Sequence, residues 1–268
     1  MTSAATDPST APELGFIGVG ALSSALLQAL NRAWPSGRFH LSPRGSAASS
    51  KLAQQYGATR HASNQAVADA AATLFIGVRP AQLQELAREL RLTPRHHLLV
   101  LAAGTPLAQL EKMFAPARVT RVMTGLAVAS GRSAIALFPA DPAAAKLLSP
   151  ACTALLPLPE EAQLDGVILA VCANAWWLDQ LSVLSTWMVQ ATGMPIEQVT
   201  ALLSANLADV ATLLRQQPDK TPRELALAIG TPGTYTAFGL DRLQQLQAHQ
   251  AWTDTLEEVL ERLQPTAG

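Results

Sequence analysis

A glycine-bearing turn near the N-terminus is the first group of residues whose types and spacing could do chemistry. The apolar run 14–17 is followed by Gly18, Gly20 and Ser23 in the spacing G-x-G-x-x-S. Glycine at the first position permits a sharp strand-to-helix bend, the second lets a backbone approach a pyrophosphate, and a small third residue allows close helix packing. Free N–H groups at the helix start would stabilise the phosphate charge. The turn therefore predicts a dinucleotide site, and the alternative is a glycine turn that binds nothing.

The segment after the second predicted strand indicates which dinucleotide would bind. A site for NAD normally has an acidic residue there for the ribose hydroxyl, whereas residues 42–46 read Ser-Pro-Arg-Gly-Ser and contain no carboxylate. Arg44 could pair with a 2′-phosphate, and Ser42 and Ser46 could donate hydrogen bonds to it. The alternative is that Arg44 is an ordinary loop arginine. The segment favours NADPH (NADP+) over NADH.

Three more segments could bind a ligand. Two of them follow predicted strands at the edge of the sheet where dinucleotides bind, and the third lies in the helical half. The first two are residues 78–80 (Val-Arg-Pro) and 102–105 (Ala-Ala-Gly-Thr), although Pro80 is also a good first residue of a helix and Gly104 a common turn residue. The third, residues 231–236 (Thr-Pro-Gly-Thr-Tyr-Thr), has hydroxyls and backbone N–H groups that could bind a carboxylate. The alternative interpretation of this segment is a turn with a threonine N-cap, and the motif on its own favours that interpretation over a carboxylate site.

The elements that must position these residues alternate between strand and helix over the first half of the chain. This pattern predicts an α/β fold, a Rossmann-like doubly wound parallel sheet, followed from about residue 159 by long helices. The expected domains are a disordered tail 1–13, a dinucleotide-binding domain 14–158 and a helical domain 159–268. The predicted strands after 14–17 are Arg38–Ser42, Thr73–Val78, His97–Ala102, Val119–Met123 and Ser133–Phe138. The predicted helices are Ala21–Ala33, Ser46–Tyr56, Asn64–Ala71, Ala81–Leu92, Pro106–Phe114, Glu160–Thr192, Pro195–Gln216, Pro222–Ile229, Thr234–His249 and Trp252–Leu263.

Composition excludes several classes of partner. The chain has 268 residues, 19 basic and 20 acidic, so its net charge of −1 predicts neither a nucleic-acid partner nor an anionic membrane surface. Two cysteines, Cys152 and Cys172, without motif spacing fit a reducing cytoplasm and a role as core residues. The five histidines lack ligand spacing, so no metal site is expected.

The apolar segment within residues 160–192 has two interpretations. Its most apolar window, 166–178, is interrupted by Asn174 and is too short to span a bilayer, so we expect no membrane segment. A helix that is apolar on nearly every face needs more partners than one small bundle supplies, which predicts a homodimer through the C-terminal helices. The other interpretation is simply a buried helix.

Taken together, the motifs resemble those of the pyrroline-5-carboxylate reductase family over nearly the whole chain. The matching segments are residues 15–20 (GFIGVG), 78–80 (VRP), 102–107 (AAGTPL), 121–123 (RVM), 231–233 (TPG), Thr236 and 239–240 (GL). The resemblance implies an N-terminal NAD(P)-binding domain, a helical domain that interlocks with a partner subunit, and reduction of a cyclic imine to an amine.

This sequence departs from the family pattern at the substrate end. Thr-Gly-Leu-Ala at 124–127 replaces the family's Pro-Asn-Thr-Pro, and residues 171–177 (VCANAWW) replace Ser-Gly-Ser-Gly-Pro-Ala-Tyr. By spacing, Asn206 replaces a threonine expected to reach the imine nitrogen, and residues 231–236 replace Ser-Pro-Gly-Gly-Thr-Thr. Two tryptophans and a tyrosine in place of small and polar residues predict a more apolar substrate site.

Three functions remain open from the sequence. The first is an NADPH-dependent imine reductase acting on a cyclic, possibly bulkier imine, and the second is unaltered pyrroline-5-carboxylate reduction. The third is a catalytically silent nucleotide-binding regulator or scaffold. The expected catalytic residues are Asn206, Tyr235 and Thr236, and the expected substrate-binding residues are Thr231, Gly233, Thr234, Trp177 and Asn174. The expected cofactor-binding residues are Gly15, Gly18, Val19, Gly20, Ala21, Leu22, Ser42, Arg44, Ser46, Val78, Arg79, Pro80, Ala103 and Gly104.

Overall fold

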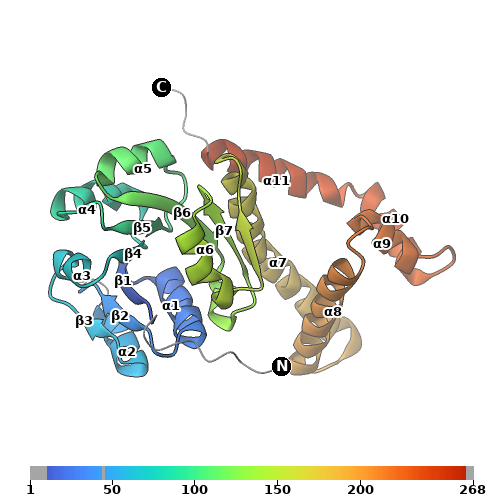
Figure 1. The fold of residues 1–268 in the computed structure, drawn as a ribbon. Coiled ribbons are helices and arrows are strands. Elements are labelled where there is room, and N and C mark those ends of the chain that lie inside the picture. Colours follow the sequence, from blue (N-terminus) through green and yellow to red (C-terminus); the bar gives the residue numbers. More distant parts are fainter. Residues whose placement is uncertain (1–10, 44–45, 264–268) are drawn as a thin grey trace. The chain divides into compact units, whose positions relative to one another are not determined.

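A computed structural model describes residues 11–43 and 46–263 of the chain, apart from the side chains of residues 46–48. Contacts divide it into two compact units, one that ends at Val171 and includes Leu263, and one formed by Cys172–Arg262. The first unit contains an eight-stranded sheet in the order β3-β2-β1-β4-β5-β6-β7-β8 (Figure 1). The strands are β1 (Glu13–Ile17), β2 (Arg38–Leu41), β3 (Thr59–Arg60), β4 (Thr73–Ile76), β5 (His97–Val100), β6 (Arg118–Thr124), β7 (Ala134–Phe138) and β8 (Ala154–Pro157).

The strands β1 to β6 all run parallel, and the strand order reverses at β1, which lies between β2 and β4. The predicted doubly wound fold is therefore confirmed. The sheet is mostly parallel: β7 pairs antiparallel with β6, and β8, which the sequence did not predict, runs parallel to β7. Residues 125–133, which include the 3-10 turn η3 (Leu126–Ser130), connect β6 to β7, and a parallel pair would need a longer crossover.

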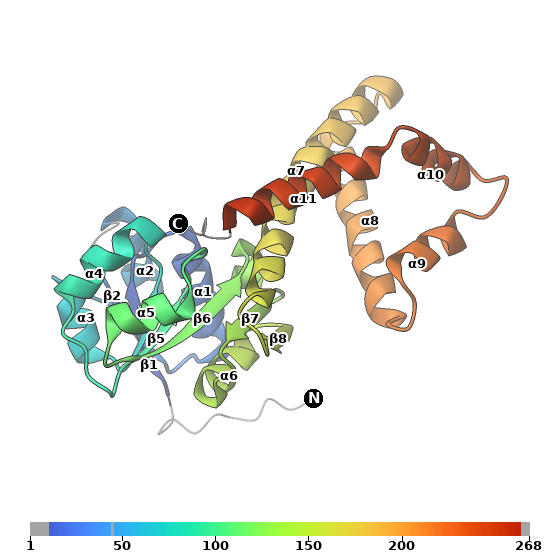
Figure 2. The same cartoon turned by 90° about the horizontal axis from the view of Figure 1, so that it is seen from above.

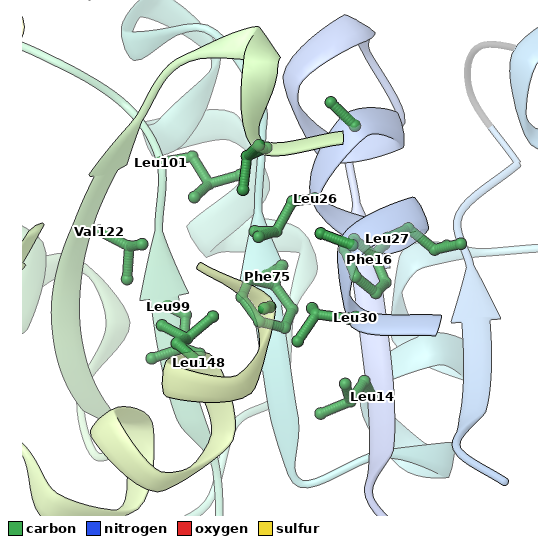
Figure 3. Close-up of a cluster of buried hydrophobic side chains, with 14 of the residues drawn as sticks. Leu14, Phe16, Leu26, Leu27, Leu30, Phe75, Leu99, Leu101, Val122 and Leu148 are labelled. Carbon is green, nitrogen blue, oxygen red and sulfur yellow. The ribbon is translucent and has the colours of Figure 1, made fainter. Parts of the chain in front are cut away.

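Helices cover both faces of the sheet (Figures 1 and 2). They are α1 (Ala21–Ala33), α2 (Ser46–Tyr56), α3 (Asn64–Ala70), α4 (Leu83–Glu89), α5 (Leu107–Phe114) and α6 (Pro142–Leu148), with the 3-10 turns η2 (Pro80–Gln82) and η4 (Ser149–Ala151). One core packs α1, α2 and α6 on the sheet, with Phe16 stacked on Phe75 at a centroid distance of 4.8 Å (Figure 3). The other core packs α3, α4 and α5 on the opposite face. Two buried layers on one sheet hold the strand ends rigidly.

The second unit is made of helices (Figure 2). They are α7 (Gln163–Thr192), which begins in the first unit, α8 (Ile196–Gln216), α9 (Pro222–Ile229), α10 (Tyr235–Gln245) and α11 (Ala248–Leu263). The predicted boundary at 249–252 is wrong: α10 ends at Gln245, and α11 begins at Ala248. Gln247, with φ 52°, interrupts the helix there, and a positive φ at a non-glycine residue carries no sequence signal as clear as a glycine.

Helix α7 corrects one argument made from the sequence. The window 166–178 is too short to span a bilayer, but the helix itself has 30 residues and is long and apolar enough to do so by length and composition. Its central region is largely exposed in the single chain. A helix buried against a partner subunit can be equally long and apolar, so length and composition alone do not distinguish a bilayer from a protein interface.

Candidate functional site

The glycine turn between β1 and α1 has the geometry that its sequence predicts. Gly18 has φ +86°, a conformation that favours glycine, and a Cβ there would lie 2.7 Å from the backbone of Gly77. The Ser23 hydroxyl donates to the Gly18 carbonyl at 2.7 Å and is buried, so the third small residue of the motif fastens the helix to the turn. The turn is thus fixed by sterics and by one side-chain hydrogen bond.

The N-terminus of α1 is open toward a ligand. Gly20 is the N-cap, and among the described residues no side chain accepts a hydrogen bond from the first helical N–H groups and no atom lies within 4 Å of a Cβ built at Gly20. The first N–H groups of a helix need acceptors, and the helix dipole favours an anion at this end. Residues 18–22 therefore form a cradle that fits a pyrophosphate.

Ser42 holds the turn from the neighbouring strand. Its side chain is fully buried, and its Oγ accepts a hydrogen bond from the Gly18 N–H at 3.1 Å. This contact joins the end of β2 to the glycine turn. Arg44 lies outside the described residues, and Ser46 begins α2 with its side chain outside them. Their contact with a 2′-phosphate stays a prediction.

The other predicted cofactor residues follow β4 and β5 at the same edge of the sheet. Val78, Arg79 and Pro80 connect β4 to α4, with the Arg79 N–H donating to the Gln82 side chain at 3.1 Å. After β5, Ala103 is half-buried, and Gly104 is exposed with φ +69°. Because β1, β4 and β5 run parallel, their following loops meet at one edge, at the point where the strand order reverses.

An ion pair behind this edge was missed by sequence reasoning. The Arg121 guanidinium is buried and donates to Glu161 Oε1 at 2.6 Å, and the same oxygen accepts the N–H of Leu107, the first residue of α5. Gly104, Arg121, Glu161 and Asp165 are among the residues that line a cavity of 210 Å³ there. Forty residues separate the two charges, so no local motif could have paired them.

The predicted carboxylate segment lies between α9 and α10 in the second unit. Gly233, Thr234 and Tyr235 line a broad hollow with Phe238 and Asp241. The Thr234 Oγ accepts a hydrogen bond from the Ala237 N–H at 3.2 Å, so Thr234 is the N-cap of α10. The interpretation of this segment as a turn with a threonine N-cap is therefore confirmed. The side chain of Tyr235 is 98% exposed. The hollow and the helix start leave room for an anionic group.

The remaining predicted substrate residues lie on other helices of the same unit. Asn206 is exposed on α8, and Asn174 and Trp177 are exposed on α7. None of the three lines the hollow at Gly233. Trp177 instead packs against Trp252 of α11, with ring centroids 4.5 Å apart. The predicted cofactor residues that follow β1, β2, β4 and β5 and that the structure describes thus lie at one edge of the sheet, whereas Gly15 lies inside β1. The predicted substrate residues of the second unit lie at separate places on its surface.

Comparison with known proteins shows which fold this arrangement of strands and helices has. The NADP oxidoreductase coenzyme F420-dependent family model matches residues 13–104. The structure of a pyrroline-5-carboxylate reductase from Streptococcus pyogenes superposes with a TM-score of 0.82 at 19% identity, covering 94% of this chain and 98% of that one. The chain has the pyrroline-5-carboxylate reductase fold. The resemblance inferred from the motifs is thus confirmed at the level of fold, over both units.

Two further structures extend the comparison. A Plasmodium falciparum pyrroline carboxylate reductase with NADP bound has a TM-score of 0.81 at 16% identity, covering 96% of this chain and 98% of that one. A reductive aminase from Aspergillus terreus in complex with NADPH and ethyl levulinate has a TM-score of 0.56 at 20% identity, covering 78% of each chain. No curated protein sequence matches the chain.

Within the reductase fold, the described residues contain no cluster of three or more His, Cys, Asp or Glu side chains placed to hold a metal ion. One acidic side chain escaped the sequence interpretation. Asp179 of α7 lines a pocket with Trp176 and Trp252. A carboxylate two residues after a tryptophan pair is a weak signal, because the third tryptophan comes from a distant helix.

Proposed function

We propose that the chain is an NADPH-dependent reductase that transfers a hydride to the C=N bond of a cyclic imine, either pyrroline-5-carboxylate or a bulkier relative. The observation that carries the proposal is the open cradle at Gly18 and Gly20, with the uncapped N-terminus of α1. The cradle lies in a fold whose relatives were solved with NADP or NADPH bound. The absence of any carboxylate in residues 42–46 supports NADPH over NADH.

The residues of the first unit would hold the cofactor. The N–H groups of residues 19–22 would bind the pyrophosphate, Arg44 and Ser46 would contact the 2′-phosphate, and the loops at Val78–Pro80 and Ala103–Gly104 would contact the nicotinamide half. Bound NADPH would supply the hydride. Gly104 has open space where a Cβ would be, which lets a flat ring approach the backbone.

The residues of the second unit would bind and protonate the substrate. The imine carbon gains a hydride and the nitrogen gains a proton, so the C=N double bond becomes a single bond and the product is an amine. Asn206, Tyr235 and Thr236 are the proposed donors or positioning groups, with Thr231, Gly233 and Thr234 for a carboxylate at the start of α10 and Asn174 and Trp177 for the ring. Of these, Tyr235 is exposed, so solvent reaches its hydroxyl.

We also propose that the protein is a cytoplasmic homodimer formed through the C-terminal helices. Large apolar side chains are exposed along α7 and α8 in the single chain, among them Leu178, Val183, Leu184, Trp187, Leu207 and Val210. So many exposed large apolar side chains on two neighbouring helices of the chain support an interface with a partner. Sedimentation should give a dimer, Val183→Glu should shift it toward monomer, and Gln190→Glu on the same helix should not. A monomer in the unaltered protein would contradict the proposal.

The rate of NADPH oxidation with a panel of imines tests the proposed function. Pyrroline-5-carboxylate would be compared with larger and more apolar cyclic imines, with NADPH binding measured separately by fluorescence. Turnover of pyrroline-5-carboxylate would show that the departures from the family pattern on α7 changed only its packing. Turnover of the larger imines alone would show that the substrate site is different. NADPH binding without turnover of any imine would instead support the catalytically silent regulator, which the replacement of the family's asparagine by Gly125 favours.

A further inference from the structure

The charges of the first unit are unevenly distributed along the sequence. Residues 14–68 contain five lysines and arginines and no aspartate or glutamate, in a chain whose net charge is −1. The five are Arg32, Arg38, Arg44, Lys51 and Arg60. This segment contains β1 to β3 with α1 and α2, the part of a doubly wound sheet that binds the adenosine half of a dinucleotide. An excess of positive charge there favours a ligand with an additional negative charge.

Among the described residues, Arg60 is the basic residue that reaches across the end of β2. It is the last residue of β3, the outermost strand beside β2 (Figure 1). Its Nη2 donates to the Pro43 carbonyl at 3.0 Å, and its Nε donates to the hydroxyl of Ser49 on α2, a fully buried side chain, at 3.1 Å. Because Ser42 bonds to the glycine turn, the Arg60 guanidinium is held at the sheet edge that carries this turn.

These two contacts leave one edge of the guanidinium free. Nε and Nη2 lie on the same edge of the planar group, and Ser49 and Pro43 use that edge. The two η nitrogens form the other edge, and no described residue accepts a hydrogen bond from it. Arg60 is exposed and has no carboxylate partner in the described part of the chain. Two parallel N–H groups on such an edge match two oxygens of a phosphate.

We propose that Arg60 binds the 2′-phosphate of NADPH through this free edge, while its bonded edge fixes the backbone at Pro43. The inference rests on the proposed function only in taking NADPH as the cofactor, and it is independent of which imine is reduced. The adenosine ribose lies beyond the end of β2 in this class of sheet, which is where the guanidinium is held. NADH has a hydroxyl in place of the phosphate, so this contact discriminates between the two nucleotides.

Two nucleotides that differ only in the 2′-phosphate test the contact in the full-length protein. Adenosine 2′,5′-diphosphate and adenosine 5′-monophosphate would be titrated by calorimetry. Arg60→Gln should weaken the diphosphate about tenfold and the monophosphate less than about twofold, because only the diphosphate loses a charge-assisted contact. The retained affinity for the monophosphate also shows that the variant is folded. Equal weakening of both nucleotides, or an unchanged affinity for the diphosphate, would overturn the proposal.

Lys51→Gln is the matched control for the general positive charge of this segment. Lys51 is exposed on α2, two residues after Ser49, and residues two apart do not share a face of a helix. Removing this charge should therefore change either affinity less than about twofold. A loss of diphosphate affinity as large as that in Arg60→Gln would overturn the proposal, because the nucleotide would then respond to net charge alone.

Phosphorus NMR distinguishes a direct contact from a role in holding the backbone. A guanidinium that touches a phosphate monoester lowers the pKa of its second ionisation, which is ordinarily about 6. At saturating diphosphate, the pKa of the bound 2′-phosphate should lie below that of the free nucleotide and return toward it in Arg60→Gln. The same bound pKa in both proteins would overturn the contact and leave Arg60 only its bond to Pro43. The predicted shifts in a protein that reduces no imine would uphold the inference and reject the proposed function.

Discussion

At the scale of single residues, we expect a substitution at Gly20 to change ligand binding and a substitution at Gly77 to change stability. A Cβ at Gly77 would lie 2.0 Å from the Ser23 hydroxyl, whereas a Cβ at Gly20 meets no described atom within 4 Å. Gly77→Ala forces Ser23 to move and breaks its bond to Gly18, so we expect a loss of about 2 kcal/mol in the free energy of unfolding. Gly20→Ala should cost less than about 1 kcal/mol and still weaken NADPH about tenfold, because the methyl occupies the phosphate cradle.

Denaturant unfolding and NADPH fluorescence titration check this pair of variants. A Gly20→Ala protein that binds NADPH as tightly as the unaltered protein would place the phosphates elsewhere. A Gly77→Ala protein of unchanged stability would contradict the close contact between the two loops.

Arg44 is the residue that we propose to set the cofactor preference. If its guanidinium pairs with the 2′-phosphate, Arg44→Ala should weaken NADPH about tenfold to a hundredfold and change NADH little, because NADH has no phosphate there. Arg88→Ala, an exposed arginine on α4, is the control and should change neither affinity. Dissociation constants for both nucleotides would be measured in each variant. Equal weakening of NADPH and NADH in Arg44→Ala would reject the assignment of NADPH.

At the scale of elements, Glu161 joins three segments that are distant in sequence. Its carboxylate accepts from Arg121 on β6 and from the first N–H of α5, and it stands just before α7. Arg121 is buried and its Nε has no partner among the described residues, so its charge depends on this one carboxylate. The ion pair thereby fixes the loop 101–106, where the nicotinamide would lie, to the base of α7.

Removing that charge should destabilise the first unit. Glu161→Gln keeps an acceptor for Leu107 but leaves the buried guanidinium without a counter-charge, so we expect a loss of about 2 kcal/mol. Glu160→Gln alters the neighbouring carboxylate, which contacts neither group, and should leave stability unchanged. Thermal unfolding of the two variants measures the difference. Equal melting midpoints would show that Arg121 has another partner.

How far the sequence predicts these elements depends on how local their signals are. The turn at Gly18–Ser23 and the strands around it follow from spacing within a few residues, and the structure confirms the fold that they imply. The reversed direction of β7 depends on how β6 and β7 pair across a short connection, which the glycines at its ends, Gly125 and Gly131, do not specify. The short edge strands β3 and β8 bury too little to show a pattern. The Arg121–Glu161 pair and the contact of Trp177 with Trp252 are tertiary, so no spacing rule could find them.

At the scale of the whole molecule, one buried imidazole makes stability depend on pH. His97 is 6% exposed, with Nε2 2.8 Å from the Thr120 hydroxyl and Nδ1 3.0 Å from the Arg118 guanidinium. Burial, and then the positive charge of Arg118, lower the pKa of His97 from 6.5 to about 4, partly opposed by Asp141. The folded protein thus keeps this histidine neutral where the unfolded chain protonates it.

The sign of the effect follows from proton binding. Above pH 6.5 the side chain is neutral in both states, and its contribution to the free energy of unfolding is constant. As the pH falls from 6.5 toward 4, the unfolded chain binds a proton that the folded protein does not, so stability falls, by about 3 kcal/mol in all. Below about pH 4 both states are protonated and this loss is complete.

Replacing the imidazole by an amide isolates this contribution from the carboxylates that titrate in the same range. Gln at position 97 can still donate to Thr120 and accept from Arg118, but it takes up no proton, so His97→Gln should flatten the dependence of unfolding free energy on pH between 4 and 6.5. His249→Gln, an exposed histidine on α11, should leave the slope as it is. The slope rather than the absolute stability is the quantity compared, since the substitution also changes packing. If His97→Gln and His249→Gln give the same slope, His97 takes up its proton in the folded protein, and the packing of β5 and β6 around it is looser than the structure shows.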